Sequence, residues 1–285
     1  MKKDSKKPSL KSDFYKKRKI GLYLGKSYVW LILALLYVPI LMIVVYSFSD
    51  GAGFANFRFS TANFTELFTS DSDSVQRMKT ALLNTVVIGL VSSLFATVLG
   101  TLGAVGLNGM SKKPRNVLLN LSNVPIFNAD IITALALMFF FLFIKVDRSV
   151  FTVLIGHIAM TCPYVMLSVL PRLKQMNMSV YEAALDLGAT PFSALIKIIV
   201  PEVFPGMVSG FALAFTLSID DFIITQFNRS STFETLSTYI YSQAAGKAGL
   251  SGALKPLSAL IFLTVLAGLV IYNIQKNKKA KAAKR

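Results

Sequence analysis

Six long apolar segments, separated by short charged stretches, constrain this chain more than any other feature. Each is long enough to cross the hydrocarbon core of a bilayer as an α-helix, which takes about 20 residues. Of the 285 residues, 54% are hydrophobic and only 15% are charged, which excludes an ordinary soluble domain. The pattern predicts an all-α, polytopic membrane protein with six transmembrane helices. The expected spans cover about residues 27–49, 81–107, 118–143, 149–170, 204–226 and 253–274.

The distribution of Lys and Arg predicts how these spans are oriented. With the N-terminus in the cytoplasm, 22 of the 30 Lys and Arg residues fall in cytoplasmic segments. Ten lie in the tail 1–26, three in 108–117, three in 171–203 and six in the tail 275–285. Loops rich in Lys and Arg stay on the cytoplasmic side, so we expect both termini there, flanking a membrane domain at 27–274. Attraction to anionic lipid explains the net charge of +16 better than nucleic-acid binding, since no basic-aromatic domain accompanies it.

The residues that carry most enzyme chemistry are missing from this chain. One histidine, His157, and one cysteine, Cys162, are too few for a usual metal site or an intrachain disulfide. The segment 21–27 ends like a phosphate-binding loop, but its glycines are one residue too close and it opens a membrane helix. We therefore expect no enzyme activity, no metal and no cofactor bound by the chain itself. His157 is expected to pack or to form hydrogen bonds rather than to relay protons.

A helical hairpin is predicted between the fourth and fifth spans. Ser179 and Glu182 form an S-x-x-E capping box, which predicts a short helix through Leu187. Gly188 is placed to end that helix, because glycine adopts the left-handed conformation without steric cost. The first helix is expected to expose an apolar face that needs a partner, made of Val180, Ala184 and Leu187.

The second helix of the hairpin has its own boundary signals. Thr190 followed by Pro191 is an N-cap and first-residue pair, so the helix is expected to start there. Pro201 is expected to mark its end.

These residues resemble the EAA loop of ABC importer permeases, whose pattern is EAA-x3-G-x9-I-x-L-P. Val200 stands where leucine is usual, and it keeps the apolar character. The resemblance implies a MetI-like permease fold, with the segment 179–203 as a coupling helix that sits in a groove of the ATPase subunit. The alternative is an amphipathic hairpin that lies on the membrane surface. The residues that match the pattern are Glu182, Ala183, Ala184, Gly188, Ile198 and Pro201.

Three carboxylates lie within the predicted spans: Asp130 in the third, Asp220 and Asp221 in the fifth. A charge at the centre of a span costs on the order of 3 kcal/mol on insertion scales, so such residues usually face a cavity or a partner. No Lys or Arg in these helices is placed to neutralise them, and their field suits a cationic ligand. Alternatively, the spans are shorter, with Asp221 at the outer interface and Asp130 capping a helix. Adjacent helical residues point about 100° apart, so Asp220 and Asp221 need not face the same cavity.

The two acidic segments, NADII and SIDDF, resemble those of spermidine/putrescine permeases, in particular their second, C-type subunit. The resemblance covers roughly residues 30–273 and departs from the commoner form by Ala129 before the aspartate. It implies a bacterial cytoplasmic-membrane permease for polyamines. The residues expected to line the substrate path are Asp130, Asp220 and Asp221, with Phe127 and Phe222 as aromatic faces for protonated amines.

The same resemblance implies a set of partners. They are a second permease that completes a heterodimer, two copies of an ABC ATPase that hold ATP and Mg, and an extracytoplasmic polyamine-binding protein. Two alternatives stay open. The first is an ABC permease for another small solute, such as an anion, a metal chelate or thiamine. The second is a stand-alone channel or proton-coupled carrier that uses the aspartates as a proton relay.

Overall fold

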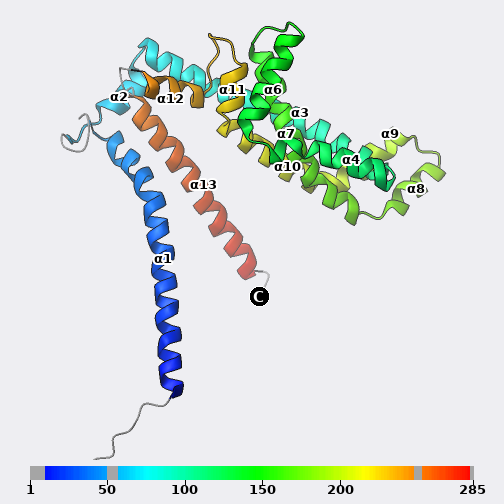
Figure 1. Ribbon diagram of the computed structural model, residues 1–285, viewed down its shortest axis with the longest axis horizontal. Helices are drawn as coiled ribbons and strands as arrows, with labels where there is room; N and C mark the ends of the chain where they lie inside the picture. The colour runs from blue at the N-terminus through cyan, green and yellow to red at the C-terminus, as the bar shows by residue number, and fades with distance from the viewer. Residues whose placement is uncertain (1–9, 50–56, 247–251, 283–285) are drawn as a thin grey trace, which may run out of the picture. The chain divides into compact units, whose positions relative to one another are not determined.

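The computed structural model describes residues 10–49, 57–246 and 252–282 (Figure 1). These residues form helices joined by short connections, with one isolated antiparallel bridge between Ser49 and Phe59. The all-α class predicted from the sequence is therefore confirmed. The two ends of the chain, 1–9 and 283–285, belong to the predicted basic tails and lie outside the described residues.

The chain divides into two compact units. Unit 1 contains residues 1–71 and 250–285. In it, α13 packs against both α1 and α2. Asn63 of α2 donates from Nδ2 to the carbonyl oxygen of Ser49 at 2.8 Å, which ties α2 to the segment that follows α1. The helices of unit 1 are α1 (Leu10–Ser47), α2 (Ala62–Thr69) and α13 (Leu254–Ala282).

Unit 2 contains residues 72–249, and its centre is the mutual packing of three long helices, α3, α7 and α10. Shorter elements connect these helices and cover their ends. The long helices are α3 (Asp73–Gly109), α7 (Val150–Gln175) and α10 (Val200–Asp220). The connecting elements are α4 (Lys112–Ser122), α5 (Val124–Phe127), α6 (Asp130–Phe143), α8 (Met178–Asp186), α9 (Pro191–Ala194), the π-helix η2 (Leu195–Ile199), α11 (Ile223–Asn228) and α12 (Leu236–Ala245).

Glycines allow the three long helices to approach one another around Val165 of α7, which is fully buried. A Cβ added at Gly100 of α3 would lie 2.8 Å from the Val165 Cβ, and one at Gly210 of α10 would lie 3.0 Å from its Cγ1. In lipid, where no hydrophobic force drives helices together, such close packing of small residues is a main source of association. The Val165 contact is therefore a fixed point of unit 2.

Four segments are long and apolar enough to cross a membrane: residues 28–47 of α1, α3, α7 and the stretch Pro191–Asp220. The third predicted span, 118–143, is wrong as a single helix, because Lys112–Phe127 and Asp130–Phe143 are bent by 107°. Counted as one broken span, they bring the number to five, and Leu254–Gly268 is a shorter apolar helix. A multi-pass helical architecture is confirmed, and the count of six stays a prediction.

The fifth predicted span, 204–226, is also interrupted. α10 ends at Asp220, Asp221 has the extended backbone angles φ −64° and ψ 130°, and α11 begins two residues later. Both interruptions fall at predicted path carboxylates, so helix ends rather than helix interiors present these groups.

A test of the close packing compares two glycines of α3. Gly100→Val is expected to destabilise the protein by about 1–3 kcal/mol, because the new side chain overlaps Val165. The control is Gly106→Val, since nothing lies within 4 Å of a Cβ at that position. Thermal unfolding of the purified protein, followed by circular dichroism, should show a lower midpoint for the first variant only. Equal midpoints would contradict the role given to this contact.

Candidate functional site

The hairpin predicted after the fourth span is present, but its first helix begins earlier than expected. Asn177 is the N-cap of α8, and its Oδ1 accepts a hydrogen bond from the Ser179 backbone N–H at 3.1 Å. The predicted Ser179–Glu182 capping box is therefore wrong, because Asn177 already takes the N–H that a first-turn cap would satisfy. Glu182 instead lies exposed on the middle of α8.

The end of α8 confirms the prediction for Gly188. This glycine has φ +89°, the left-handed conformation. Its N–H donates to the Leu185 carbonyl at 2.9 Å, and the next N–H, of Ala189, donates to the Ala184 carbonyl at 3.0 Å. This pair of bonds is a Schellman motif, which satisfies the last carbonyls of a helix and reverses the chain.

The second helix starts as predicted and continues further than predicted. The Thr190 hydroxyl accepts from the Ser193 N–H at 3.2 Å, and Pro191 is the first helical residue. Pro201 does not end the helix: the π-helix η2 leads directly into α10, and Pro201 lies in the first turn of α10. Proline has no N–H to donate and its ring needs room near the preceding turn, and the wider π-turn accommodates both demands.

Large apolar side chains of the hairpin lie on the surface of unit 2. Leu187 is 89% exposed, Phe192 70% and Val180 55%. We call these three residues the hairpin surface. All three belong to one hairpin, and large exposed apolar patches mark interaction sites. Among the residues that match the EAA pattern, Glu182, Ala183, Gly188 and Pro201 are exposed, and Ala184 and Ile198 are half-buried.

A buried polar centre lies at the other end of α7 and α10. His157 of α7 is 1% exposed, and its Nδ1 shares a hydrogen bond with the Ser218 hydroxyl of α10. Its Nε2 lies 2.9 Å from the Thr225 hydroxyl and 3.3 Å from Oδ2 of Asp221. The Ser218 hydroxyl is also 2.9 Å from the Ser92 hydroxyl of α3. Polar groups of four helices therefore satisfy one another around His157, which is buried and has a hydrogen-bond partner at each ring nitrogen.

The Asp221 carboxylate accepts hydrogen bonds from the start of α11, the helix that follows it. Its Oδ1 accepts from the Ile224 N–H at 3.1 Å. Its Oδ2 accepts from the Thr225 N–H at 2.9 Å and from the Thr225 hydroxyl at 2.8 Å. A carboxylate at a helix N-terminus also gains from the helix dipole. Among the described residues no Lys or Arg pairs with Asp221, as the sequence predicts, but its carboxylate is not free: only 9% of the residue is exposed, and the carboxylate caps α11.

The other two aspartates differ from Asp221. Asp130 is the first residue of α6 and Asp220 the last residue of α10, and both are exposed. Neither makes an ion pair within the described parts of the chain. Each has an aromatic neighbour: Phe127, which is 85% exposed, precedes Asp130 across the helix break, and Phe222, whose ring centroid lies 4.8 Å from that of Tyr241, follows Asp220.

The sequence interpretation missed Ser92, Ser218 and Thr225. Each is a small hydroxyl residue in or beside an apolar stretch, and serines and threonines there often bond only to their own helix. The one signal that could have found them is the lone His157, which needs partners for two ring nitrogens when it is buried. Across the described residues, no group of three or more His, Cys, Asp or Glu could hold a metal ion.

Residues 96–281 match the family described as "Binding-protein-dependent transport system inner membrane component". The chain belongs to this family. It is 30% identical over 262 residues to the spermidine/putrescine transport system permease protein PotC of Escherichia coli K12, covering 92% of this chain and 97% of that one. It is 31% identical over 239 residues to the putrescine transport system permease protein PotI of the same strain, covering 79% and 81%.

A solved structure shares the fold of this permease. It is a bacterial alginate ABC transporter in complex with an alginate pentasaccharide-bound periplasmic protein. The TM-score is 0.64, with 20% sequence identity over 92% of this chain and 94% of that one. The expected MetI-like permease fold is confirmed. At this identity the likeness supports the fold and not the substrate.

The two adjacent aspartates give a matched test of the polar centre. Asp221→Ala removes a helix cap, worth about 1 kcal/mol, and leaves buried donors without a partner, at about 1–3 kcal/mol. The exposed neighbour provides the control, Asp220→Ala. We expect the thermal unfolding midpoint of the purified permease to fall by roughly 4 °C or more for Asp221→Ala and to stay unchanged for Asp220→Ala. Identical midpoints for the two variants would mean that the cap contributes nothing.

Proposed function

We propose that this permease is one of two membrane subunits of an ATP-driven importer for polyamines, in the bacterial cytoplasmic membrane with both termini cytoplasmic. The observation that carries the substrate class is the pair of exposed, unpaired carboxylates, Asp130 and Asp220, at helix ends inside the apolar part of unit 2. The similarity to polyamine permeases over most of the chain supports the same class.

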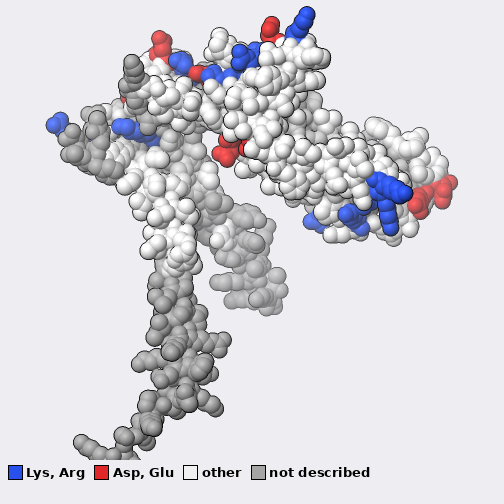
Figure 2. Space-filling model, viewed as in Figure 1, with Lys and Arg blue, Asp and Glu red and all other residues white. Residues whose placement is uncertain are grey.

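Charge is distributed unevenly over unit 2. In Figure 2, basic and acidic side chains gather at the two ends of unit 2, and most of the surface between them is uncharged. Acidic atoms interrupt this uncharged surface, whereas basic atoms do not in this view. A cation that enters such a surface finds attraction without a competing positive charge.

The chemistry of the two helix ends suits a polyamine. Its amines resemble the lysine ammonium group and are largely protonated at pH 7. A carboxylate offers each ammonium group an ion pair, and an aromatic face offers a cation–π contact of about 0.5–2 kcal/mol. Asp130 with Phe127 and Asp220 with Phe222 would provide these two kinds of contact at the two helix breaks. We assign Asp221 a supporting role, since its carboxylate holds the break that presents Asp220.

The hairpin surface is the proposed coupling site. Leu187, Phe192 and Val180 would dock into a groove of an ABC ATPase, two copies of which would hold ATP and Mg and hydrolyse ATP outside this chain. A second permease would complete the substrate path. The family description, with its dependence on a binding protein, supports an extracytoplasmic partner that delivers the polyamine.

The substrate assignment is tested by neutralising the two exposed aspartates. Asp130→Asn and Asp220→Asn keep the side-chain volume and remove the charge. Loss of a dominant charge-assisted contact is expected to lower polyamine affinity about ten- to a hundredfold. The measurement is radiolabelled spermidine uptake into vesicles that contain the reconstituted complex. The control is Asp73→Asn, another exposed aspartate, which lies in the first turn of α3. Undiminished uptake by both variants and by the double variant would refute the polyamine path.

The coupling assignment is tested at Gly188. Gly188→Val forces a β-branched residue into the left-handed conformation, at about 1 kcal/mol or more, although the space around the position is open. We expect normal amounts of the variant in the membrane, weaker association with the ATPase and reduced uptake. The control is Gly109→Val, which has similar free space but no positive φ. Full ATP-driven uptake by Gly188→Val would show that the hairpin geometry does not matter for coupling.

A further inference from the structure

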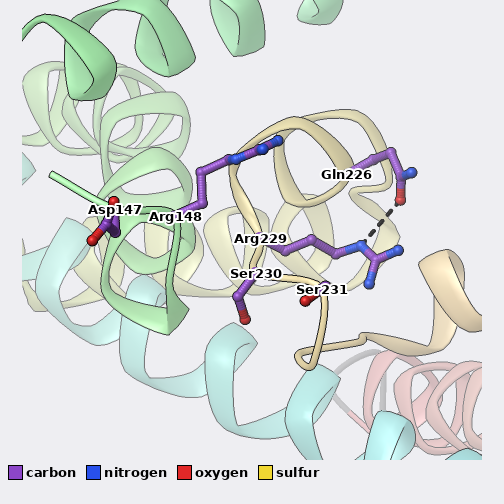
Figure 3. Close-up of a pocket in the computed structure, with 6 residues that line it drawn as sticks. All are labelled: Asp147, Arg148, Gln226, Arg229, Ser230 and Ser231. Atoms are coloured by element: carbon purple, nitrogen blue, oxygen red, sulfur yellow. Dashed lines mark hydrogen bonds between the residues drawn. The ribbon is translucent and has the colours of Figure 1, made fainter. Parts of the chain in front are cut away.

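A cationic pocket of about 480 Å³ opens at the end of unit 2 where α7 begins and α11 ends. It is formed by the loop between α6 and α7 and by the end of α11 with the residues that follow (Figure 3). Nothing in the proposed transport of polyamines uses this pocket. Its lining residues are Asp147, Arg148, Gln226, Arg229, Ser230 and Ser231.

The pocket and the hairpin surface lie at opposite ends of unit 2. The pocket residue Arg148 precedes α7 and the hairpin follows it, while α10 runs from the hairpin back toward α11. The 26 residues of α7 make a helix about 39 Å long, which exceeds the hydrocarbon core of about 30 Å. If the hairpin faces the cytoplasm, as proposed, the pocket therefore faces the outside.

Arg229 is held in place before any ligand arrives. Its Nε donates to Oε1 of Gln226 at 3.2 Å, and one terminal nitrogen donates to the Phe233 carbonyl at 2.9 Å. The Glu234 carboxylate lies 3.9 Å from that nitrogen, but both of its oxygens also accept from one terminal nitrogen of Arg77, at 2.9 and 3.0 Å. One carboxylate thus faces two guanidinium groups, and a positive charge is left over beside the pocket.

Arg148 adds a second cation that has no partner of its own. It is exposed, and it makes no hydrogen bond or ion pair in the described parts of the chain. Figure 3 shows its side chain extending toward α11 and Gln226, while the Asp147 carboxylate points away from both arginines. A guanidinium group presents two parallel N–H donors that match the two oxygens of a carboxylate.

This charge excludes the proposed substrate as the ligand of the pocket. A protonated polyamine would be repelled by Arg148 and Arg229, whereas an anion would find two cations and two serine hydroxyls. We propose that the pocket receives a carboxylate side chain, Asp or Glu, of the extracytoplasmic binding protein when that protein docks. The inference rests on the proposed function for the existence of this partner, and it holds whatever solute the partner carries.

The experiment measures docking directly, so that it does not depend on the transported solute. The complete importer is placed in lipid nanodiscs, and the affinity of its fluorescently labelled binding protein is measured at several salt concentrations. Arg148→Gln is expected to weaken docking about tenfold and to make its salt dependence shallower, because one desolvated charge pair is lost. The matched control, Lys145→Gln, removes an exposed charge from the same loop outside the pocket and should change the affinity less than twofold.

A double-mutant cycle identifies the partner group. Each exposed Asp and Glu on the docking face of the binding protein is changed to Asn or Gln and is tested against parent and Arg148→Gln importers. One carboxylate should lose about tenfold in affinity with the parent and nothing further with Arg148→Gln. That result would confirm the inference even if radiolabelled spermidine were not transported, which would refute only the substrate.

Two outcomes would overturn the inference. The first is equal docking by parent and Arg148→Gln, or the lack of any carboxylate that couples to Arg148. The second is a docking defect that appears only when the nanodiscs contain anionic lipid, because the pocket would then hold a lipid phosphate. Arg229→Lys serves as a second variant, because it keeps the positive charge and loses the paired donors. Since the proposal gives the free guanidinium group to Arg148, Arg229→Lys should weaken docking less than Arg148→Gln does.

Discussion

The arrangement of the end of unit 2 where α10 meets α11 depends on one buried carboxylate, that of Asp221. Isolated in an apolar interior, this charge would be very costly, and here it accepts hydrogen bonds from the start of α11 and lies against His157. Through His157 it is connected to Ser218 and Ser92, so that α3, α7, α10 and α11 meet at one point. The helix break that presents Asp220 exists because these groups satisfy one another.

Two kinds of contact hold unit 2 together: close packing at glycines and hydrogen bonds between buried polar groups. Around Val165 the helices touch through glycines, which lie against a valine side chain and the backbone of α7. Around His157 they touch through hydrogen bonds. The first kind fixes distance, because overlap is costly whichever way a helix slides. The second kind fixes register, because donors and acceptors must face each other. Neither kind of contact involves Asp130 at the start of α6, Asp220 at the end of α10 or the hairpin surface, so these groups stay exposed on unit 2.

The sequence predicted where helices occur better than it predicted where they break. Hydrophobic runs show where the chain enters lipid, and Gly188 and Thr190 carry local signals that do not depend on the rest of the fold. The capping box was wrong because Asn177 and Ser179 are both good N-caps, and local sequence does not choose between them. The role of Asp221 was not predicted for a different reason. An aspartate at this position can contact a ligand or cap a helix, and the sequence around it does not distinguish the two roles. Its buried neighbour His157 lies 64 positions away on another helix. The break before Asp130 was expected only in the alternative of shorter spans, with Asp130 capping a helix, because hydropathy measures transfer to lipid and not backbone direction.

The unbroken passage from the hairpin into α10 has a mechanical consequence. On one side, α8 is joined to the rest of the hairpin by the Gly188 reversal, which two backbone hydrogen bonds hold. On the other side, Pro191–Asp220 runs as one helical rod, with a single wide turn at η2 that adds about one residue, or 100° of rotation, to the winding. In the proposed coupling, a tilt applied at Phe192 would therefore reach the opposite tip of the rod, where Asp220 lies about 40 Å away. In the proposed coupling, the hairpin would act as the short arm of a lever whose long arm is α10.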